Sequence, residues 1–437
     1  MAIATLSKIR QNSSRLIMKH FFIFLNVLAF HISVIGQDSM SLTLEEAYSL
    51  AKQNYPLSRQ QQLIRTSRNY SIENISKGNL PQLSINGQAS YQSDVTEIPL
   101  KLPNIDIPVL NADQYRIYGE IKQDLYDGGV KKIQKKLVDA SAAAGEQELE
   151  VELYKLKGRI NEIYFGILLI NEQLAQSKFL ENDIQLALQK TKAAIANGIA
   201  LKSSGDNLKA ELLKVEQRRI ELEAINKAYR DKLSQFINRS VDKHTILEKP
   251  VFAKSSNDIH RPELVFFDKK QRSLDVQKQL IEAKNRPKIG LFFDGGYGRP
   301  GLNMLKNSFE PYYIGGVRLN WSLSGLYTAK KEKALTGIKQ QTIDLQKETF
   351  LFNTRLEVKS QEADINKLRE LIKTDSSIIH LRNRIKNTAL AQLEYGVINS
   401  GDYLRELNAE DQARQMQLLH EIQLLKAICQ RKTTTGN

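Results

Sequence analysis

The sequence predicts a mainly α-helical protein with a small β part, built from a duplicated unit of long coiled-coil helices and one β-hairpin. The motif SGDNL at residues 204–208 returns as SGDYL at residues 400–404, between long helical stretches in both cases. Only 10 prolines and 23 glycines occur in 437 residues, so the elements are expected to be long. Four segments, two in each half, alternate polar and apolar residues with a period of two.

The N-terminal part has the pattern of a secretory signal peptide. Four basic residues precede an apolar run from Phe21 to Ile35, and a small residue stands before the expected cleavage site. We expect residues 1–36 to be the signal, with either Met1 or Met18 as the initiator. A transmembrane anchor is the alternative, but the run is short for a bilayer. No later segment offers about eighteen uncharged apolar residues, so insertion into a membrane is expected only through β-strands.

Composition and charge exclude several function classes. The formal net charge is +14, but the basic residues are scattered among 49 acidic ones, so we expect no nucleic-acid partner. The single cysteine, Cys429, has no partner for a disulfide or a redox pair. The six histidines lack metal-ligand spacing, and the glycine-rich run at residues 295–298 lacks the lysine of a phosphate loop. We therefore expect no enzyme activity, no metal and no cofactor.

The alternating segments have the pattern of strands that face lipid on one side. They run from Gln82 to Tyr91, Tyr115 to Leu125, Ile289 to Tyr297 and Tyr313 to Leu323. Aromatic residues near their ends suit a membrane interface. A soluble sheet with one wet face has the same alternation, and the signal peptide favours the membrane. The side chains expected to face the membrane are Leu83, Ile85, Ile117, Ile121, Leu291, Phe293, Val317, Leu319 and Trp321.

Four strands cannot close into a transmembrane barrel, because the smallest such barrels have about eight. The chain is therefore expected to oligomerise, so that neighbouring copies cover the edges of its strands. Two copies would supply eight strands and three copies twelve, and the periodicity does not choose between these numbers.

The rest of the sequence predicts long helices. Apolar residues from Leu153 to Leu174 recur at intervals of three and four, as in a coiled-coil seam. The run from Val130 to Asn197 contains no proline and would reach roughly 100 Å as a helix. The spans from Gly128 to Gly198 and from Gly325 to Gly396 cover 70 and 71 residues, so helices of matching length are expected in both halves.

Shorter helices are expected before and after each long one. We expect them over Thr43–Lys77 and Pro262–Arg286 before the hairpins, and from about Asp206 and Asp402 after the turns. These two aspartates are expected to be N-caps.

This organisation predicts four segments after the signal. Residues 37–238 form the first repeat, and residues 239–261, which contain proline and serine without a helical period, form a linker. Residues 262–432 form the second repeat, and residues 433–437 are expected to be a disordered tail.

Several short motifs resemble those of the TolC-like outer-membrane efflux protein family. LTLEEA at residues 42–47, followed by NYP at 54–56, resembles the family's opening helix, and QDLYDGG at 123–129 resembles the exit from its second strand. RPEL at 261–264 resembles the start of the second repeat, and YGVINSGD at 395–402 resembles the periplasmic tip. The resemblance covers nearly the whole mature chain, and its specificity comes from the order and spacing of the motifs.

The resemblance implies a homotrimer in which each copy gives four strands to a twelve-stranded β-barrel, continued through the periplasm by an α-helical barrel. It implies a location in the cell outer membrane and a passive exit duct for small molecules or polypeptides. The partners would be a periplasmic adaptor protein and an inner-membrane pump, in efflux or type I secretion. The alternative from another class is a soluble secreted or periplasmic coiled-coil protein, structural or adaptor-like, which leaves the four strands unexplained.

The resemblance also implies functional residues at the tip. In the family, acidic side chains form a constriction that attracts cations at the periplasmic end; Asp402 matches the first acidic position, and Arg405 stands where the best-known member has a second acid. A ring of Arg405 would weaken the field of Asp402 on cations. Helix capping is the alternative role of Asp402. The residues that would face the adaptor, or simply form turns between helices, are Gly198, Ile199, Gly396 and Val397.

Lysines cluster after each hairpin, at residues 131–136 and 330–333. In a trimer they would form a collar beneath the inner leaflet, where anionic headgroups could bind. A solvated helix face is the alternative interpretation.

Overall fold

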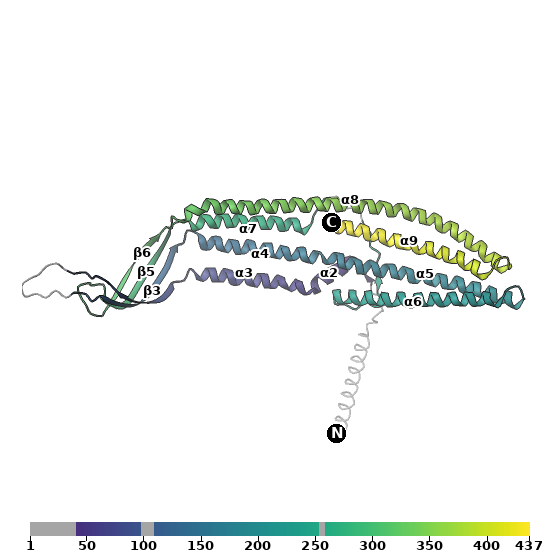
Figure 1. Ribbon diagram of the computed structural model, residues 1–437, viewed down its shortest axis with the longest axis horizontal. Helices are drawn as coiled ribbons and strands as arrows, with labels where there is room; N and C mark the ends of the chain where they lie inside the picture. Colours follow the sequence, from purple (N-terminus) through teal and green to yellow (C-terminus); the bar gives the residue numbers. More distant parts are fainter. Residues whose placement is uncertain (1–40, 98–108, 253–257) are drawn as a thin grey trace, which may run out of the picture.

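The structure, a computed structural model, describes residues 41–97, 109–252 and 258–437. The chain is elongated, with a small β-sheet at one end and a layer of long helices that runs from it to the opposite end (Figure 1). The expected signal peptide, residues 1–36, and both candidate initiators lie outside the described residues. The prediction of a mainly helical protein with a small β part is confirmed.

Four antiparallel strands form the sheet. They are β2 (Gln82–Tyr91), β3 (Asp113–Tyr126), β5 (Lys288–Arg299) and β6 (Glu310–Asn320). They pair in the order β2-β3-β5-β6, so the two hairpins join through β3 and β5. Each expected strand is present within a few residues of its expected bounds.

In the described ranges, seven longer helices form the layer. They are α3 (Gln60–Lys77), α4 (Val130–Tyr154), α5 (Leu156–Ala196), α6 (Lys202–Ile237), α7 (Pro262–Lys284), α8 (Gly325–Glu394) and α9 (Ser400–Thr435). Near the sheet they pack in the order α3-α4-α7-α8, and near the opposite end in the order α6-α5-α9-α8 (Figure 1). Helix α8 runs along the whole layer, and its 70 residues reach roughly 105 Å.

The prediction of one helix over Thr43–Lys77 is wrong in one respect, because the chain forms two helices there. Helix α2 (Leu44–Asn54) ends before Pro56, a short 3₁₀ turn follows, and α3 begins at Gln60. Proline lacks a backbone N–H and disfavours the helical conformation in the residue before it, and Tyr55 is extended, with ψ of 129°. The long run from Val130 is also divided, at the single residue Lys155.

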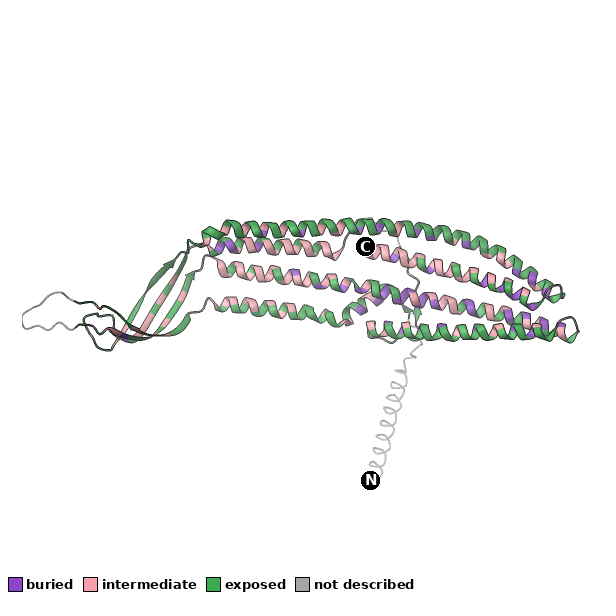
Figure 2. Cartoon of the chain, viewed as in Figure 1, coloured by how far each residue is buried: buried purple, intermediate pink, exposed green. Residues whose placement is uncertain are grey.

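The largest core lies midway along the layer, where α2, α5 and α6 meet. Helix α5 supplies the largest share of it, and Figure 2 shows buried residues concentrated along the first half of α5, near the middle of the layer. Ile160, Tyr164 and Ile167 of α5 are fully buried, as are Ala47 of α2 and Leu233 of α6. The seam predicted from apolar spacing in this region is therefore a packed core.

The same core holds the two segments that flank the helices. Strand β1 (Ser41–Leu42) pairs in parallel with β4 (Ile246–Leu247), which lies in the expected linker. The hydroxyl of Tyr164 lies 2.7 Å from the Leu42 carbonyl oxygen and 2.8 Å from that of Glu248. One buried side chain thus ties both segments to α5.

A buried arginine holds the first part of the linker. The Arg230 guanidinium on α6 donates to the carbonyl oxygen of Thr245 at 3.1 Å and to that of Asp242. Burial lowers the pKa of Arg230. Because a buried charge is costly without partners, these carbonyl groups fix the linker against the helices.

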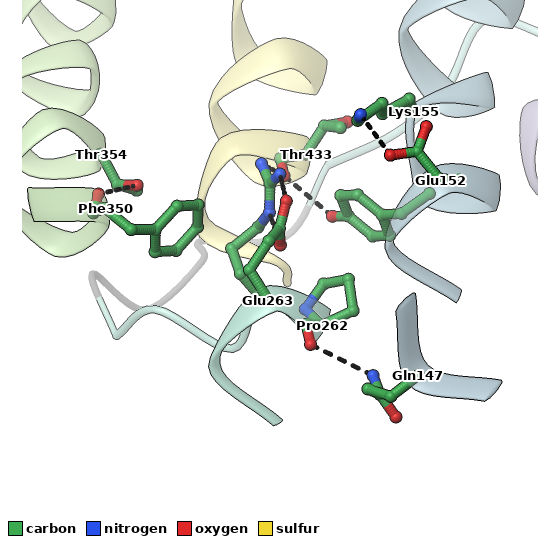
Figure 3. Close-up of polar contacts among 10 residues, drawn as sticks. Gln147, Glu152, Lys155, Pro262, Glu263, Phe350, Thr354 and Thr433 are labelled. Atoms are coloured by element: carbon green, nitrogen blue, oxygen red, sulfur yellow. Dashed lines mark hydrogen bonds and ion pairs between the residues drawn. The ribbon is translucent and has the colours of Figure 1, made fainter. Parts of the chain in front are cut away.

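The chain enters α7 beside the end of α9 (Figure 3). The Thr433 carbonyl oxygen accepts hydrogen bonds from the Tyr154 hydroxyl at 2.8 Å and from Arg261 at 3.3 Å. Arg261 also forms an ion pair with Glu263, in the first turn of α7. These contacts connect α4, α7 and α9 in the middle of the molecule.

The expectation of a disordered tail at residues 433–437 is wrong. Helix α9 continues to Thr435, whose exposed fraction is 0%, and the Thr435 carbonyl oxygen accepts a hydrogen bond from the His260 backbone at 2.6 Å. Gly436, with φ of +86°, then ends the helix in the left-handed conformation. The last turn is ordered because it packs against the chain that leads into α7.

At the end far from the sheet, the α5–α6 pair and the α8–α9 pair share an apolar cluster. It joins all four helices and consists of Ile184, Ala187, Leu208, Val215, Ala389, Leu393, Tyr403, Leu404 and Leu407. Next to this cluster the contact becomes polar. Lys386 Nζ of α8 lies 2.8 Å from Asp183 of α5 and 3.6 Å from Glu410 of α9, whose exposed fraction is only 2%.

Asp411 adds a second buried carboxylate to this contact. It accepts hydrogen bonds from Gln176 Nε2 of α5 at 2.9 Å and from Gln415 Nε2 at 2.6 Å. Burial raises the pKa of Asp411, and the two hydrogen bonds offset this only in part. The two helix pairs are therefore joined by polar groups that are costly to bury unless each keeps its partners.

We predict that Tyr164→Phe loosens the linker. The change removes the donor shared by Leu42 and Glu248, and an unsatisfied buried carbonyl costs about 1–3 kcal/mol. Proteolysis between residues 239 and 252 should then be about 5- to 160-fold faster when cleavage follows local opening. Tyr395→Phe, at a residue that is 80% exposed, is the matched control. Equal cleavage rates in the two variants would contradict this role of Tyr164.

We predict that Asp411→Asn raises the melting temperature at pH 8. Because the folded-state pKa is above the unfolded value, the folded protein takes up a proton first as the pH falls, so acid relieves the cost of the buried charge. The advantage of the variant should therefore shrink as the pH falls through the folded-state pKa. Asp206→Asn, on the exposed surface of α6, should show no such trend. A difference in melting temperature that does not change with pH would contradict this explanation.

Candidate functional site

One face of the sheet is apolar and exposed. Residues directly opposite each other on neighbouring strands share a face, and Leu83 lies opposite Ile121, which lies opposite Phe293. The same register places on this face the expected membrane-facing residues Leu83, Ile85, Ile117, Ile121, Leu291, Phe293, Val317 and Leu319. Trp321 continues the alternation after β6. The exposed fractions of the nine range from 42% for Ile121 to 84% for Ile85.

The opposite face of the sheet is mostly polar. Lys122 Nζ lies 2.6 Å from Glu120 on the same strand, and Arg318 of β6 lies 3.7 Å from the same carboxylate. The Arg318 guanidinium also stacks over the Phe292 ring at 4.3 Å. The sheet therefore separates an apolar side from a charged side.

Both edges of this sheet are open in the described part of the chain. Strand β2 pairs only with β3, and β6 pairs only with β5. Each edge leaves a row of backbone N–H and C=O groups that could pair with another strand. At 10 and 11 residues, both edges are long enough to hold a further strand along their length.

The two outer sides of the helix layer carry exposed apolar side chains at seven-residue intervals. On α8 these are Ile338, Leu345 and Phe352, which are 58–63% exposed. The other side of the layer carries Leu63 and Tyr70 on α3 and Leu213 and Ile220 on α6. A seven-residue interval is that of a coiled-coil seam, so these side chains suit packing against a further helix.

At the far end, each helix pair closes in a tight turn. Gly198 joins α5 to α6 with φ of +74°, and Gly396 joins α8 to α9 with φ of +69°, so a side chain at either position would be strained. The turns touch, because a Cβ on Gly396 would lie 3.0 Å from Ile199 Cγ2. Val397 is 69% exposed beside them. The four expected tip residues therefore lie together.

Asp402 is not the N-cap of α9, and that expectation is wrong. The cap is Asn399, whose side-chain oxygen accepts from the backbone of Gly401 at 2.8 Å and of Asp402 at 3.0 Å. Asp206 likewise lies inside α6, which begins at Lys202. Both helices begin earlier than expected, so both aspartate side chains are available for other partners.

The repeated motif therefore occupies different positions on the two helices. It begins six residues after Gly198 but four residues after Gly396. Asp402 is the third residue of α9, whereas Asp206 is the fifth of α6. Only Asp402 lies in the first turn, where the helix dipole favours a negative charge.

Asp402 and Arg405 form an ion pair, with Arg405 Nη2 3.3 Å from Asp402 Oδ1. Arg405 Nε also lies 3.4 Å from Glu406. These side chains border a groove of about 690 Å³ between α8 and α9, together with Arg384 and Thr388 of α8. The groove thus contains two arginines and two acidic residues, and its charge is balanced.

Sequence reasoning missed the polar contact between the helix pairs. Glu410 and Asp411 follow Tyr403 and Leu407 at intervals of three and four, so both occupy positions where a core residue is expected. That spacing was a usable signal. The helix that they pack against gave no such signal. Asp183 on that helix, for example, lies 203 residues from its partner Lys386 in sequence.

The described residues contain no group of three or more histidine, cysteine, aspartate or glutamate side chains arranged to hold a metal ion. None of the described helices is long and apolar enough to cross a membrane. The candidate functional surfaces are the apolar sheet face, the open edges and the tip.

No protein-family model and no curated protein sequence matches the chain. Solved structures do match it. CusC, which forms a transmembrane channel, aligns with a TM-score of 0.64 and 14% identity over 90% of this chain and 92% of CusC. The MtrE outer-membrane channel of Neisseria gonorrhoeae aligns with a TM-score of 0.62 and 14% identity, over 90% and 89% of the two chains.

The CmeC outer-membrane channel of Campylobacter jejuni is also similar, with a TM-score of 0.59 and 13% identity over 90% of this chain and 85% of CmeC. At this level of identity the likeness establishes the fold. The single copy therefore has the fold of these outer-membrane channels, in agreement with the resemblance to TolC-like proteins.

Proposed function

We propose that the chain is an outer-membrane exit duct, acting in a tripartite efflux pump or a type I secretion system. The observation that carries the proposal is a sheet with one exposed apolar face and two open edges, joined to a helix layer whose outer sides are also apolar. A single copy leaves all of these surfaces in contact with water. The likeness of the fold to outer-membrane channels supports the proposal.

The open edges favour a closed ring of copies. Pairing β6 of one copy with β2 of the next would satisfy both edges, and packing α8 against α3 and α6 of the next would bury the apolar side chains on both sides. Such head-to-tail contacts form a closed ring when the rotation between neighbouring copies is a whole fraction of a full turn. The resemblance to TolC-like proteins gives three copies and hence a twelve-stranded barrel.

In this arrangement the apolar sheet face contacts the lipid of the outer membrane, and the polar face lines the duct. Membrane contact is the role we propose for Leu83, Ile85 and the seven other residues on that face. The helices would then continue the duct across the periplasm, over the roughly 105 Å that α8 spans.

At the tip, the rings of Asp402 and Arg405 would form the narrow end of the duct, while Gly198, Ile199, Gly396 and Val397 would face the periplasmic adaptor. The adaptor would connect the duct to an inner-membrane pump. Passage would be passive, and the chain would catalyse no reaction. The pair of Arg405 with Asp402 would reduce the attraction of the opening for cations.

The alternative function, a soluble coiled-coil rod, would place the apolar sheet face in water. Nine apolar side chains at 42% exposure or more on one continuous face are unusual for a soluble monomer. Dependence of solubility on detergent separates the two candidates. A soluble, detergent-free monomer would favour the rod.

We predict that Leu345→Glu with Phe352→Glu reduces the trimer at least tenfold. Each change removes a side chain whose burial between copies is worth about 1.5–3 kcal/mol and replaces it with a charge. The native mass of the detergent-extracted protein measures the outcome. Val251→Glu with Leu302→Glu, at exposed positions away from both outer sides, is the matched control. A trimer that survives the α8 changes would contradict the proposed interface.

We predict that Arg405→Gln makes the reconstituted duct more selective for cations, by about two- to tenfold in the cation-to-anion permeability ratio. The change frees Asp402 from its partner. Lys209→Gln is the control, because Lys209 forms the same type of pair with Asp206 on α6. Unaltered selectivity in Arg405→Gln, or an equal effect of Lys209→Gln, would remove Asp402 and Arg405 from the constriction.

A further inference from the structure

A band of positive charge surrounds the junction between the sheet and the helices. The four stretches that meet there, residues 72–81, 127–136, 278–288 and 322–333, contain twelve lysines and arginines against four acidic residues. Their net charge of +8 is more than half of the +14 of the whole chain, in about a tenth of its length. Figure 1 places the ends of α3, α4, α7 and α8 next to one another at this junction.

Ion pairs within the chain neutralise only part of this band. Lys131 lies 2.8 Å from Asp124, and Lys333 lies 2.8 Å from Glu282. The side chains of Lys132, Lys136, Lys330 and Lys331 form no ion pair with the described residues, and all four residues are exposed. Four positive charges per copy are therefore available to an external partner.

Helix stability does not explain these lysines. Lys132 lies in the first turn of α4, where the helix dipole disfavours positive charge, and Lys132 and Lys136 repel each other one turn apart. Lys330 and Lys331 lie in the second turn of α8. Neither helix has an acidic residue in its first turn, although the Asp127 carboxylate accepts hydrogen bonds from the backbone of Gly129 and of Lys131, the second residue of α4. Lys132 and Lys136 therefore gain no stability from their position on α4, and an anion outside the chain would stabilise their charge.

The neighbouring surface identifies the partner. The apolar face of the sheet ends at this junction, and Tyr126, Trp321 and Tyr327 lie between that face and the lysines, with exposed fractions of 46%, 54% and 83%. Apolar side chains, then aromatic rings, then lysines is the order found at a membrane interface. A phosphate in a lipid headgroup would lie at the level of the lysines.

We infer that this band binds anionic phospholipid headgroups in the leaflet on the helix side of the sheet. The inference rests on the proposed insertion of the sheet into the membrane and adds a lipid class to it. The partner is a phosphodiester headgroup with net negative charge, such as phosphatidylglycerol. Each lysine near an anionic surface is worth about 1 kcal/mol, which corresponds to roughly fivefold in binding.

The single tryptophan of the chain, Trp321, permits a direct test, because it lies beside the band. The full chain is reconstituted into mixed vesicles of phosphatidylcholine and phosphatidylglycerol, with bromine on one lipid or the other. Bromine quenches tryptophan fluorescence at close range, so the two experiments give the preference of the Trp321 surroundings for the anionic lipid. We expect a preference of at least about fivefold, reduced by high salt.

The decisive variant is Lys132→Gln, Lys136→Gln, Lys330→Gln and Lys331→Gln combined, in which the preference should fall close to one. The matched control removes the same charge far from the band, by Lys192→Gln, Lys202→Gln, Lys243→Gln and Lys359→Gln, and should keep the preference. A preference of one in the unmodified protein, or equal loss in both variants, would overturn the inference. Absence of quenching by either lipid would instead contradict the membrane insertion on which the inference rests.

Discussion

A sheet of four strands that cannot close on itself is the constraint on which the rest of the molecule depends. Its register puts the apolar residues of all four strands on one face and leaves the backbones of β2 and β6 unpaired at the two edges. Unpaired backbone groups cannot remain in a lipid environment, because no water is present to satisfy them. If the apolar face contacts lipid, another copy of the chain has to supply the missing strands.

The helix layer also needs neighbouring copies of the chain to cover its outer sides. Each half of the chain sends one helix to the sheet and leaves it again in a long helical run, so the layer has an outer helix on each side (Figure 1). Apolar side chains at seven-residue intervals on α8, α3 and α6 are exposed in the described part of one copy. The same ring of copies that completes the sheet would bury these side chains. The sheet and the helices therefore favour the same assembly.

Within one copy, the two helix pairs are joined in two distinct ways. Midway along the layer the contact is a dense apolar core around Tyr164, which also fixes the flanking strands and the linker. Nearer the tip the contact includes Lys386, Glu410 and Asp411, which are buried and rely on their mutual geometry. Apolar contacts tolerate small shifts, whereas buried charges lose much of their stabilisation when a partner moves. The relative position of the two pairs is therefore defined most sharply near the tip.

The sequence by itself determined the strands, the long helices and the turns at Gly198 and Gly396. Each of these follows from a local rule: a period of two, a period near 3.6, or a backbone conformation that only glycine adopts easily. The break before Pro56 follows from an equally local rule, the effect of proline on its own residue and on the one before it. The spacing of Glu410 and Asp411 after Tyr403 and Leu407 was a further local signal of burial, which was missed and which could not identify their partners.

Only the tertiary structure decided the pairing of β3 with β5 and the partners of Lys386. It also decided that the last turn of α9 is ordered. These depend on segments that are distant in sequence, such as Asp183 for Lys386 and His260 for Thr435. The start of α9 at Ser400 was also decided there, so that Asn399 caps the helix and Asp402 is free to pair with Arg405. Local periodicity indicates which residues are suited to burial. Whether they are buried, and against what, depends on segments that are distant in sequence.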